Sequence, residues 1–200
     1  YHQEEDIKPV DLATSSIGQT FKVTPLQMVT ALAAIANGGN LMQPYIVQQI
    51  LDSDGNVVSN TEPVVKRQVI SADTSKRMAA MLENAVSGGA IANAYVSGYR
   101  VAGKTGTSEK TETKNEEDPN NEVEVVASFG GFAPADDPQV AVLVMVDEPS
   151  LKSGGGVAAP VAKKILENIL PYLGIEPRYT EAELASLNRT VPRVTSMTTA

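Results

Sequence analysis

The chain contains no cysteine, and its single histidine, His2, lies at one extreme end. Without cysteine there is no disulfide and no thiolate metal site, although this does not fix the compartment. One terminal histidine argues against a histidine-based triad and against a multi-histidine metal centre. We therefore predict that the chain binds no metal and needs no cofactor.

Long apolar runs are also missing. The longest unbroken run is 140–146, far short of the ~20 residues that cross a bilayer, and no signal peptide is visible. The net charge of −8 argues against a nucleic-acid partner, because phosphate backbones attract basic surfaces. The chain has 200 residues, of which 42% are hydrophobic, and this is typical of one globular domain that is followed by a short tail.

Three helices are predicted from capping residues and periodicity. The first begins at Thr24-Pro25-Leu26-Gln27, which spells a capping box, and Gly38-Gly39 ends it. The second covers 72–87 after Ser71, and the third covers 157–172. The expected buried faces are Met78, Met81, Leu82, Ala85 and Val86 on the second helix, and Val161, Ile165, Leu166, Ile169, Leu170 and Leu173 on the third.

Strand patterns fall into two groups. Short pieces at 45–51, 57–58 and 64–70 enclose turn residues at 52–56, which predicts a hairpin excursion. Longer patterns cover 99–107, 123–133 and 139–146, and the short turn between the last two makes them antiparallel. The run 140–146 lacks polar alternation, so we expect it to be buried on both faces. Residues 1–23 are polar and show no regular pattern.

Lys104 has two competing interpretations. Gly98-x-x-x-x-Gly103-Lys104-Thr105 fits the phosphate-binding loop of nucleotide hydrolases, and the apolar run ending in Asp147-Glu148 resembles their magnesium-positioning strand. Such a loop needs a strand before it and a helix that begins at its Lys-Thr. The residues after Thr105 are polar throughout and offer no helical face for a sheet. The nucleotide hydrolase therefore stays a distant alternative.

The second interpretation is the Lys-Thr-Gly element of penicillin-recognising enzymes. Lys104-Thr105-Gly106-Thr107 falls on a predicted strand that antiparallel neighbours follow. The glycine lets a substrate backbone lie close, and the lysine offers charge to a carboxylate. The threonine hydroxyls can donate to that carboxylate, and a backbone N–H can hold a developing oxyanion.

Several further stretches carry a resemblance. They are 11–19 followed by 23–28, 36–39 with 44–46, 98–108, 128–136, and 154–160, which reads GGGVAAP. In this order and spacing, over about 11–173, the chain resembles class B penicillin-binding proteins of the sporulation or division type found in Gram-positive bacteria. The resemblance implies an α+β fold, in which an antiparallel sheet has helices packed on both faces, as in serine β-lactamases.

The resemblance also implies an activity. Relatives of this kind are peptidoglycan D,D-transpeptidases outside the cell, which cross-link stem peptides through a serine acyl-enzyme that β-lactams trap. Carried over by position, Lys104, Thr105, Gly106 and Thr107 form the substrate-binding strand. Thr105 and Thr107 would contact the carboxylate of the substrate or β-lactam. The Thr107 N–H would be half of the oxyanion hole.

The chain departs from the family pattern in one large respect. The family uses Ser-x-x-Lys, then Ser-x-Asn, then Lys-Thr-Gly, but no Ser-x-x-Lys occurs here, and the only Ser-x-Asn is Ser186-Leu187-Asn188, after Lys104. The chain therefore corresponds to the C-terminal part of a transpeptidase domain, without a catalytic residue of its own. We expect it to be inactive alone, and its start at Tyr1 agrees with this. A non-catalytic scaffold module of a cell-wall assembly is the alternative.

The same resemblance predicts partners and boundaries. Two strands of the family sheet come from upstream, so strand 139–146 would expose an edge to the N-terminal half of the domain or to another chain. We place the transpeptidase part at 1–173 and a linker at 174–200, where 190–198 resembles the opening of a PASTA module. The polar stretch 106–122 is expected to be a loop beside the cleft. Contact with a membrane is expected only through an N-terminal anchor absent from this chain, on the outer face of the cytoplasmic membrane.

Overall fold

The computed structural model describes residues 7–19, 22–110 and 122–190. Its centre is a three-stranded antiparallel sheet in the order β5 (Ala102–Glu109), β6 (Val125–Ala133) and β7 (Val140–Asp147). In the register of the sheet, Thr105 lies opposite Phe129, and Phe129 lies opposite Val144. The predicted antiparallel arrangement of these strands is confirmed.

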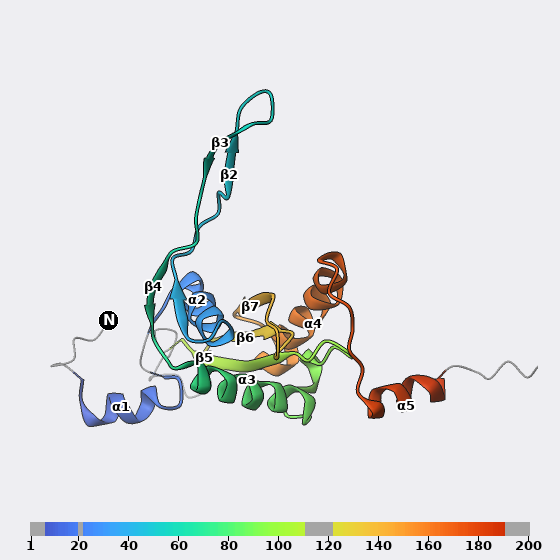
Figure 1. Ribbon diagram of the computed structural model, residues 1–200. Helices are drawn as coiled ribbons and strands as arrows, with labels where there is room; N and C mark the ends of the chain where they lie inside the picture. The colour runs from blue at the N-terminus through green and yellow to red at the C-terminus, as the bar shows by residue number, and fades with distance from the viewer. Residues whose placement is uncertain (1–6, 20–21, 111–121, 191–200) are drawn as a thin grey trace, which may run out of the picture.

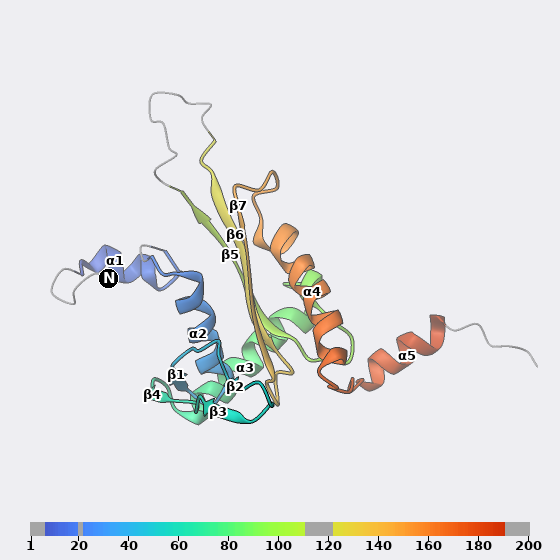
Figure 2. The same cartoon turned by 90° about the horizontal axis from the view of Figure 1, so that it is seen from above.

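Helices cover both faces of this sheet (Figure 2). α4 (Gly154–Tyr172) lies on one face, while α2 (Pro25–Ala36) and α3 (Ala72–Ser87) lie on the other. The capping box of Thr24 and Gln27 is present, with the Gln27 N–H 3.2 Å from the Thr24 hydroxyl oxygen. The predicted α+β fold with helices on both faces is confirmed.

The faces of β6 divide the core between the helices. Phe129 points to α4 and packs with the apolar side chains of that helix, and Phe132 points to α2 and α3. Both phenylalanines are fully buried, and each contributes roughly 1.5–3 kcal/mol from the apolar area removed from water. The α4 face of the core contains Ala158, Ala159, Ala162, Leu166 and Leu170, and the other face contains Ala79, Ala102 and Ala135.

Two predicted helix faces were partly wrong. Val161 and Ile165 of α4 are 43% and 40% exposed, because alanines occupy the side that faces the sheet and allow a close approach. Met81 of α3 is 62% exposed, whereas Val86 is buried as predicted, and Ser75 and Ala79 are buried although they were not predicted to be. The hydrophobicity of its residues alone does not predict which side of an amphipathic helix packs against the sheet.

Two strands also differ from prediction. β5 begins at Ala102 rather than at residue 99, because Arg100 has a positive φ of 46°, which interrupts the extended backbone. The run 140–146 is not buried on both faces: Val142 is its buried residue, and Met145 is 46% exposed. β7 contacts α4 and α2, but it lies at the edge of the described sheet.

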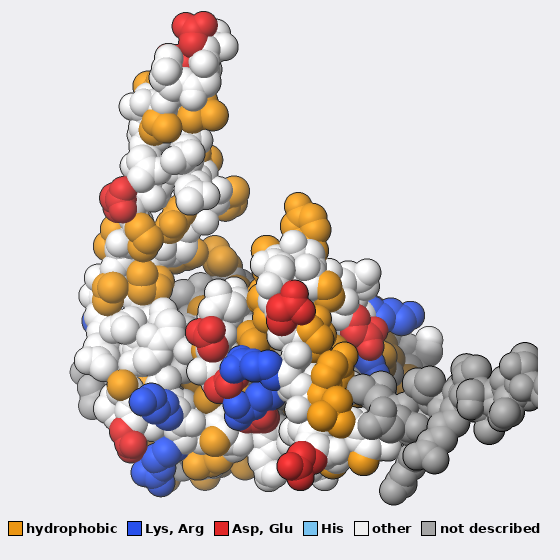
Figure 3. All heavy atoms as spheres, turned by 45° about the vertical axis from the view of Figure 1, so that its right-hand side comes forward, with side chains coloured by type: hydrophobic (Ala, Val, Ile, Leu, Met, Phe, Trp, Pro, Cys, Tyr) orange, Lys and Arg blue, Asp and Glu red, His pale blue; other side chains and the backbone are white. Residues whose placement is uncertain are grey.

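A two-stranded arm projects from the body between α2 and α3, as predicted for the hairpin excursion (Figure 1). β1 (Asn40–Met42) pairs with β4 (Val65–Gln68) at its base, and β2 (Gln49–Leu51) pairs with β3 (Val57–Asn60) beyond. The Asp52 carboxylate closes the outer turn by accepting the N–H groups of Asp54 and Asn56, each at 2.9 Å. Figure 3 shows hydrophobic side chains along the arm and acidic ones at its tip.

The absence of regular structure expected for 1–23 was wrong at one point. α1 (Pro9–Ser15) is a single short helix, which begins with proline at its first position. The Lys8 N–H donates to the Asp11 carboxylate at 3.0 Å. No residue of α1 is buried, which explains why the sequence has no hydrophobic periodicity that predicts this helix.

The segment after α4 is attached to the body by hydrogen bonds to the carboxylate of Glu183, which lies on α5 (Glu181–Thr190). Glu183 Oε1 accepts the Tyr95 hydroxyl, the Ser97 hydroxyl at 3.1 Å and the Gly98 N–H at 2.8 Å, while Oε2 accepts the Thr180 N–H at 2.6 Å. Burial disfavours the charged carboxylate, but these hydrogen bonds outweigh it and lower the pKa of Glu183 to about 2.

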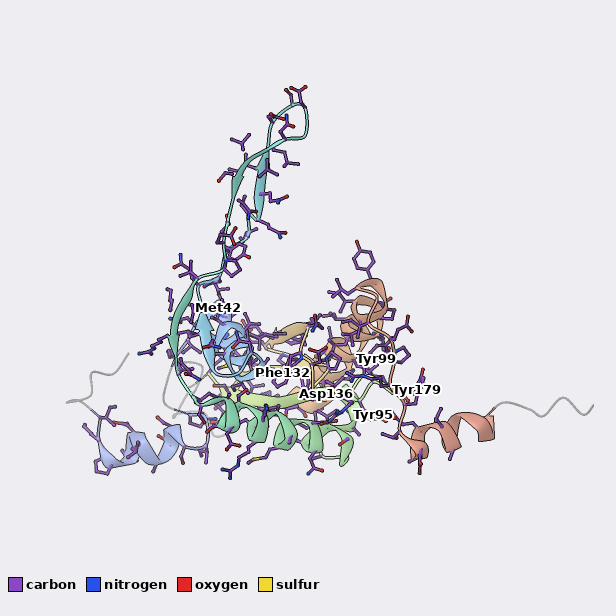
Figure 4. The ribbon with its side chains drawn as sticks, in the orientation of Figure 1. Met42, Tyr95, Tyr99, Phe132, Asp136 and Tyr179 are labelled. Atoms are coloured by element: carbon purple, nitrogen blue, oxygen red, sulfur yellow. The ribbon has the colours of Figure 1, made fainter. Side chains whose placement is uncertain are left out.

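The backbone before α5 makes a second contact at Gly98. The Arg178 N–H donates to the Gly98 carbonyl at 2.7 Å. Gly98 has a φ of 80°, and a Cβ added there would lie 2.8 Å from Pro177 Cβ, so only glycine fits. Tyr95, Tyr99 and Tyr179 lie together at this junction (Figure 4). Residues 191–198, most of the stretch that resembles a PASTA module, lie outside the described residues.

Replacing Glu183 by glutamine is expected to loosen segment 174–185. The neutral amide accepts hydrogen bonds more weakly, and bonds to charged groups contribute about 1.5–3 kcal/mol. We expect amide hydrogen exchange in this segment to become at least about tenfold faster at pH 7. Glu181→Gln, an exposed change on the same helix, is the control, and equal exchange in both variants would contradict the assignment.

The attachment of this segment should also depend on pH. Because the pKa of Glu183 is lowered in the folded chain, its contribution is fully present above the ordinary glutamate pKa near 4.5. It should decline as the pH falls from about 4.5 to about 2. Exchange or limited proteolysis across this window measures the decline, and Glu183→Gln should flatten it.

Candidate functional site

The four predicted site residues lie side by side in the middle of β5. Lys104, Thr105, Gly106 and Thr107 pair with 127–130 of β6. β5 is the end strand of its sheet, and no strand in the described part of the chain pairs with its other side. The sequence therefore predicted a set of residues that the structure presents along one open strand edge.

The hydrogen-bond pattern determines which backbone groups face that edge. The Lys110 N–H donates to the Glu124 carbonyl at 2.7 Å, and in an antiparallel pair every second residue bonds to the partner strand. The backbone groups of Lys104 and Gly106 consequently point to β6, and those of Thr105 and Thr107 point to the open edge. The same rule applies between β6 and β7. The Glu148 N–H donates to the Val125 carbonyl at 2.9 Å, so the odd-numbered residues of β6 bond to β7 and the even-numbered ones bond to β5.

Side chains of the site divide between the two faces of the sheet. Thr105 and Thr107 share the α4 face with Gly103, which lies against the Phe129 ring, while Lys104 shares the opposite face with Ala102. Lys104 is exposed, and its Nζ curls round the edge to donate to the Thr105 carbonyl at 2.9 Å. A positive charge and two hydroxyls thus flank the same length of open edge.

The first turn of α4 closes the site on the threonine side. The Gly154 N–H donates to Thr107 Oγ1 at 3.3 Å. A Cβ at Gly154 would lie 2.4 Å from the carbonyl oxygens of Gly106 and Ser128, whereas one at Gly155 would lie 3.8 Å from Thr105 Cγ2. Gly154 is thus wedged against the backbone of two strands. The N-terminus of α4, the positive end of the helix dipole, therefore lies next to the Thr107 hydroxyl, which favours an anionic ligand there.

This geometry differs from a phosphate-binding loop. Lys104 and Thr105 lie within a strand, and no helix begins at them. The segment before them contains the buried side chains of Tyr99 and Val101 rather than an open loop. The described residues therefore lack the helix N-terminus that a nucleotide phosphate would need at Lys104.

An ion network that the sequence analysis missed fixes the entrance to β5. Arg100 donates to both Glu83 oxygens, at 2.7 and 2.8 Å, and contacts Asp136 at 2.7 Å. The hydrogen bonds to Glu83 raise the pKa of Arg100. Arg178, in the segment before α5, contacts the same Asp136 at 3.0 Å. These partners lie far apart in the sequence, so no local pattern reports them.

The groups at the open edge of β5 are hydrogen-bond donors: the Lys104 ammonium, the threonine hydroxyls and the Thr107 N–H. The sequence contains no Ser-x-x-Lys. Within the ranges given above, no three metal-ligating side chains gather, and no helix there is long and apolar enough to cross a bilayer. The arrangement can bind an extended, carboxylate-bearing ligand along β5 and donate an N–H to an oxygen of that ligand.

Comparison with known proteins agrees with this geometry. Residues 2–167 match the family described as "Penicillin binding protein transpeptidase domain". Stage V sporulation protein D of Bacillus subtilis (strain 168) is 43% identical over 182 residues, covering 90% of this chain and 28% of that protein. PbpA of Mycolicibacterium smegmatis, a peptidoglycan D,D-transpeptidase, is 36% identical over 160 residues, covering 76% of this chain and 30% of that protein. The chain thus spans less than a third of these curated relatives.

Solved structures give the same result. The transpeptidase domain of penicillin-binding protein 3 from Burkholderia pseudomallei superimposes with a TM-score of 0.69 at 32% identity, covering 88% of this chain and 50% of that one. Penicillin-binding protein A from M. tuberculosis, solved as a ceftriaxone acyl-enzyme complex, gives 0.66 at 31% identity, covering 78% and 34%.

The contrast between Gly154 and Gly155 predicts opposite effects of the same substitution. Gly154→Ala places a methyl group against two backbone carbonyls and should destabilise the fold by about 1–3 kcal/mol or more. Gly155→Ala meets only ordinary contacts and should be neutral or stabilise by up to about 1 kcal/mol through helix propensity. Urea unfolding of both variants measures this, and equal effects would refute the wedge.

Proposed function

The chain belongs to the penicillin-binding protein transpeptidase family, and we propose on that premise that it supplies the substrate-binding wall of a peptidoglycan D,D-transpeptidase. The observation that carries the proposal is the open edge of β5, where the Lys104 ammonium reaches the Thr105 carbonyl and the Thr107 hydroxyl lies beside the first turn of α4. The substrate is a peptidoglycan stem peptide, and a β-lactam takes its place as an inhibitor.

In this proposal each group has a separate task. The stem peptide lies along the open edge, and Gly106 keeps the strand free of a side chain where the substrate approaches. The charge of Lys104 and the hydroxyls of Thr105 and Thr107 bind the terminal carboxylate. The Thr107 N–H, which faces the edge, donates to the oxyanion that forms when the serine attacks.

The serine nucleophile, its lysine and the relay serine come from residues outside this sequence. A segment upstream in the same protein, or a second polypeptide, supplies Ser-x-x-Lys and Ser-x-Asn, and this chain alone turns over no substrate. β7 offers the joining surface, because by the same alternation the backbone groups of Ala141, Leu143 and Met145 point outward. Strands of the N-terminal part pair there.

The whole protein would act on the outer side of the cytoplasmic membrane, where peptidoglycan is cross-linked, in sporulation or division. The similarity to Stage V sporulation protein D supports this placement, and a Gram-positive source stays a prediction. A non-catalytic scaffold is the second candidate, favoured by the absence of Ser-x-x-Lys in this sequence.

Intact-mass spectrometry after incubation with ceftriaxone separates these candidates. In the complete protein we expect one adduct, on a serine of the Ser-x-x-Lys segment, and no adduct on this chain expressed alone. An adduct on this chain alone would show that one of its own serines is a nucleophile. No adduct on the complete protein would favour the scaffold.

Removing the Thr107 hydroxyl should weaken binding of the carboxylate. Thr107→Val keeps the shape of the side chain but loses the donor, so in the complete protein the second-order rate of acylation should fall about 10- to 100-fold. Thr107→Ser should stay within a few fold. Ser108→Ala, on the opposite face of β5, is the control, and an equal loss there would contradict the assigned role.

A further inference from the structure

The first turn of α4, which bonds to Thr107 of β5, is intrinsically weak. It contains three consecutive glycines, Gly154 to Gly156, each of which costs a helix about 1 kcal/mol relative to alanine. Pro160, one turn later, has no N–H to donate to the Gly156 carbonyl. The position of this turn therefore depends on contacts from outside the helix.

Two side chains supply such contacts. Ser153 caps the helix by accepting the Gly156 N–H at 3.2 Å. Asn93 donates its Nδ2 to the Gly155 carbonyl at 2.8 Å from the 3-10 turn η2 (Ala92–Ala94). Asn93 is exposed, but its neighbours Ile91 and Ala94 are buried in the core cluster on the α4 face. The Asn93 amide therefore bonds to α4 from a turn whose neighbouring residues are fixed in the core.

The first turn of α4 also orients the Thr107 hydroxyl. Oγ1 of Thr107 accepts the Gly154 N–H, and a hydroxyl has only one proton to donate. With an acceptor position of the oxygen engaged by α4, that proton is directed away from the helix. A shift of the first turn would release the hydroxyl to rotate.

We propose that Asn93 is a positioning residue for carboxylate binding by Thr107. This inference rests on the proposed transpeptidase function. Asn93 touches neither the substrate nor a reacting group. It holds the Gly155 carbonyl, so that Gly154 keeps its bond to Thr107 and the Thr107 hydroxyl stays directed to the open edge of β5.

The test uses Asn93→Ala in the complete protein, with Asn168→Ala as a matched control. Asn168 makes the same kind of bond on the same helix, Nδ2 to the Lys164 carbonyl at 2.7 Å, far from the site. Acylation is measured with benzylpenicillin and with its methyl ester, which lacks the carboxylate. Amide hydrogen exchange of residues 154–157 is measured in parallel.

In Asn93→Ala we expect acylation by benzylpenicillin to slow about three- to tenfold, which corresponds to the loss of one hydrogen bond. Acylation by the methyl ester should be unchanged, and exchange at 154–157 should be faster. Equal slowing with both compounds would indicate a merely structural role and overturn the inference, as would matching behaviour of the two alanine variants. A wild-type protein that neither compound acylates would instead refute the function on which the inference rests.

Discussion

The backbone contact between Gly154 and the two strands beneath it is the constraint on which the rest of the site depends. A helix start without a side chain lies against the carbonyls of Gly106 and Ser128. The next buried residues of α4 are small alanines, and the larger Leu166 and Leu170 fill the core farther along the helix. The close contact at Gly154 brings the first N–H of α4 within reach of Thr107.

The strand that carries the site is fixed at its entrance and beside its centre, while its outer side stays open. At the entrance, Arg100 joins α3 to the β6–β7 turn, and Glu183 fastens the C-terminal segment next to it. Beside the centre, the first N–H of α4 bonds to Thr107. A binding edge benefits from this arrangement, because a ligand that adds to a rigid strand loses little free energy in ordering it.

Local signals in the sequence predicted what local physics decides. The caps at Thr24 and Ser71, the hairpin turn at Asp52 and the strand bearing Lys104 each depend on residues a few positions apart. The exposed faces of Val161 and Met81, the contact of Asn93 with Gly155 and the anchoring of Glu183 depend on partners brought together only by the fold. Segment 174–185 is polar and has no hydrophobic period. Its sequence therefore did not predict that hydrogen bonds to the Glu183 carboxylate attach it to the body.

Lys104 has a consequence beyond the ligand binding proposed for it. An unpaired strand edge is a template for aggregation, and a lysine on the edge is one of the devices by which natural sheets prevent it. Here the ammonium group occupies the Thr105 carbonyl, one of the acceptors that an intruding strand would use. The same side chain therefore hinders the pairing of this edge with a further strand, which is a role separate from the ligand binding proposed for it.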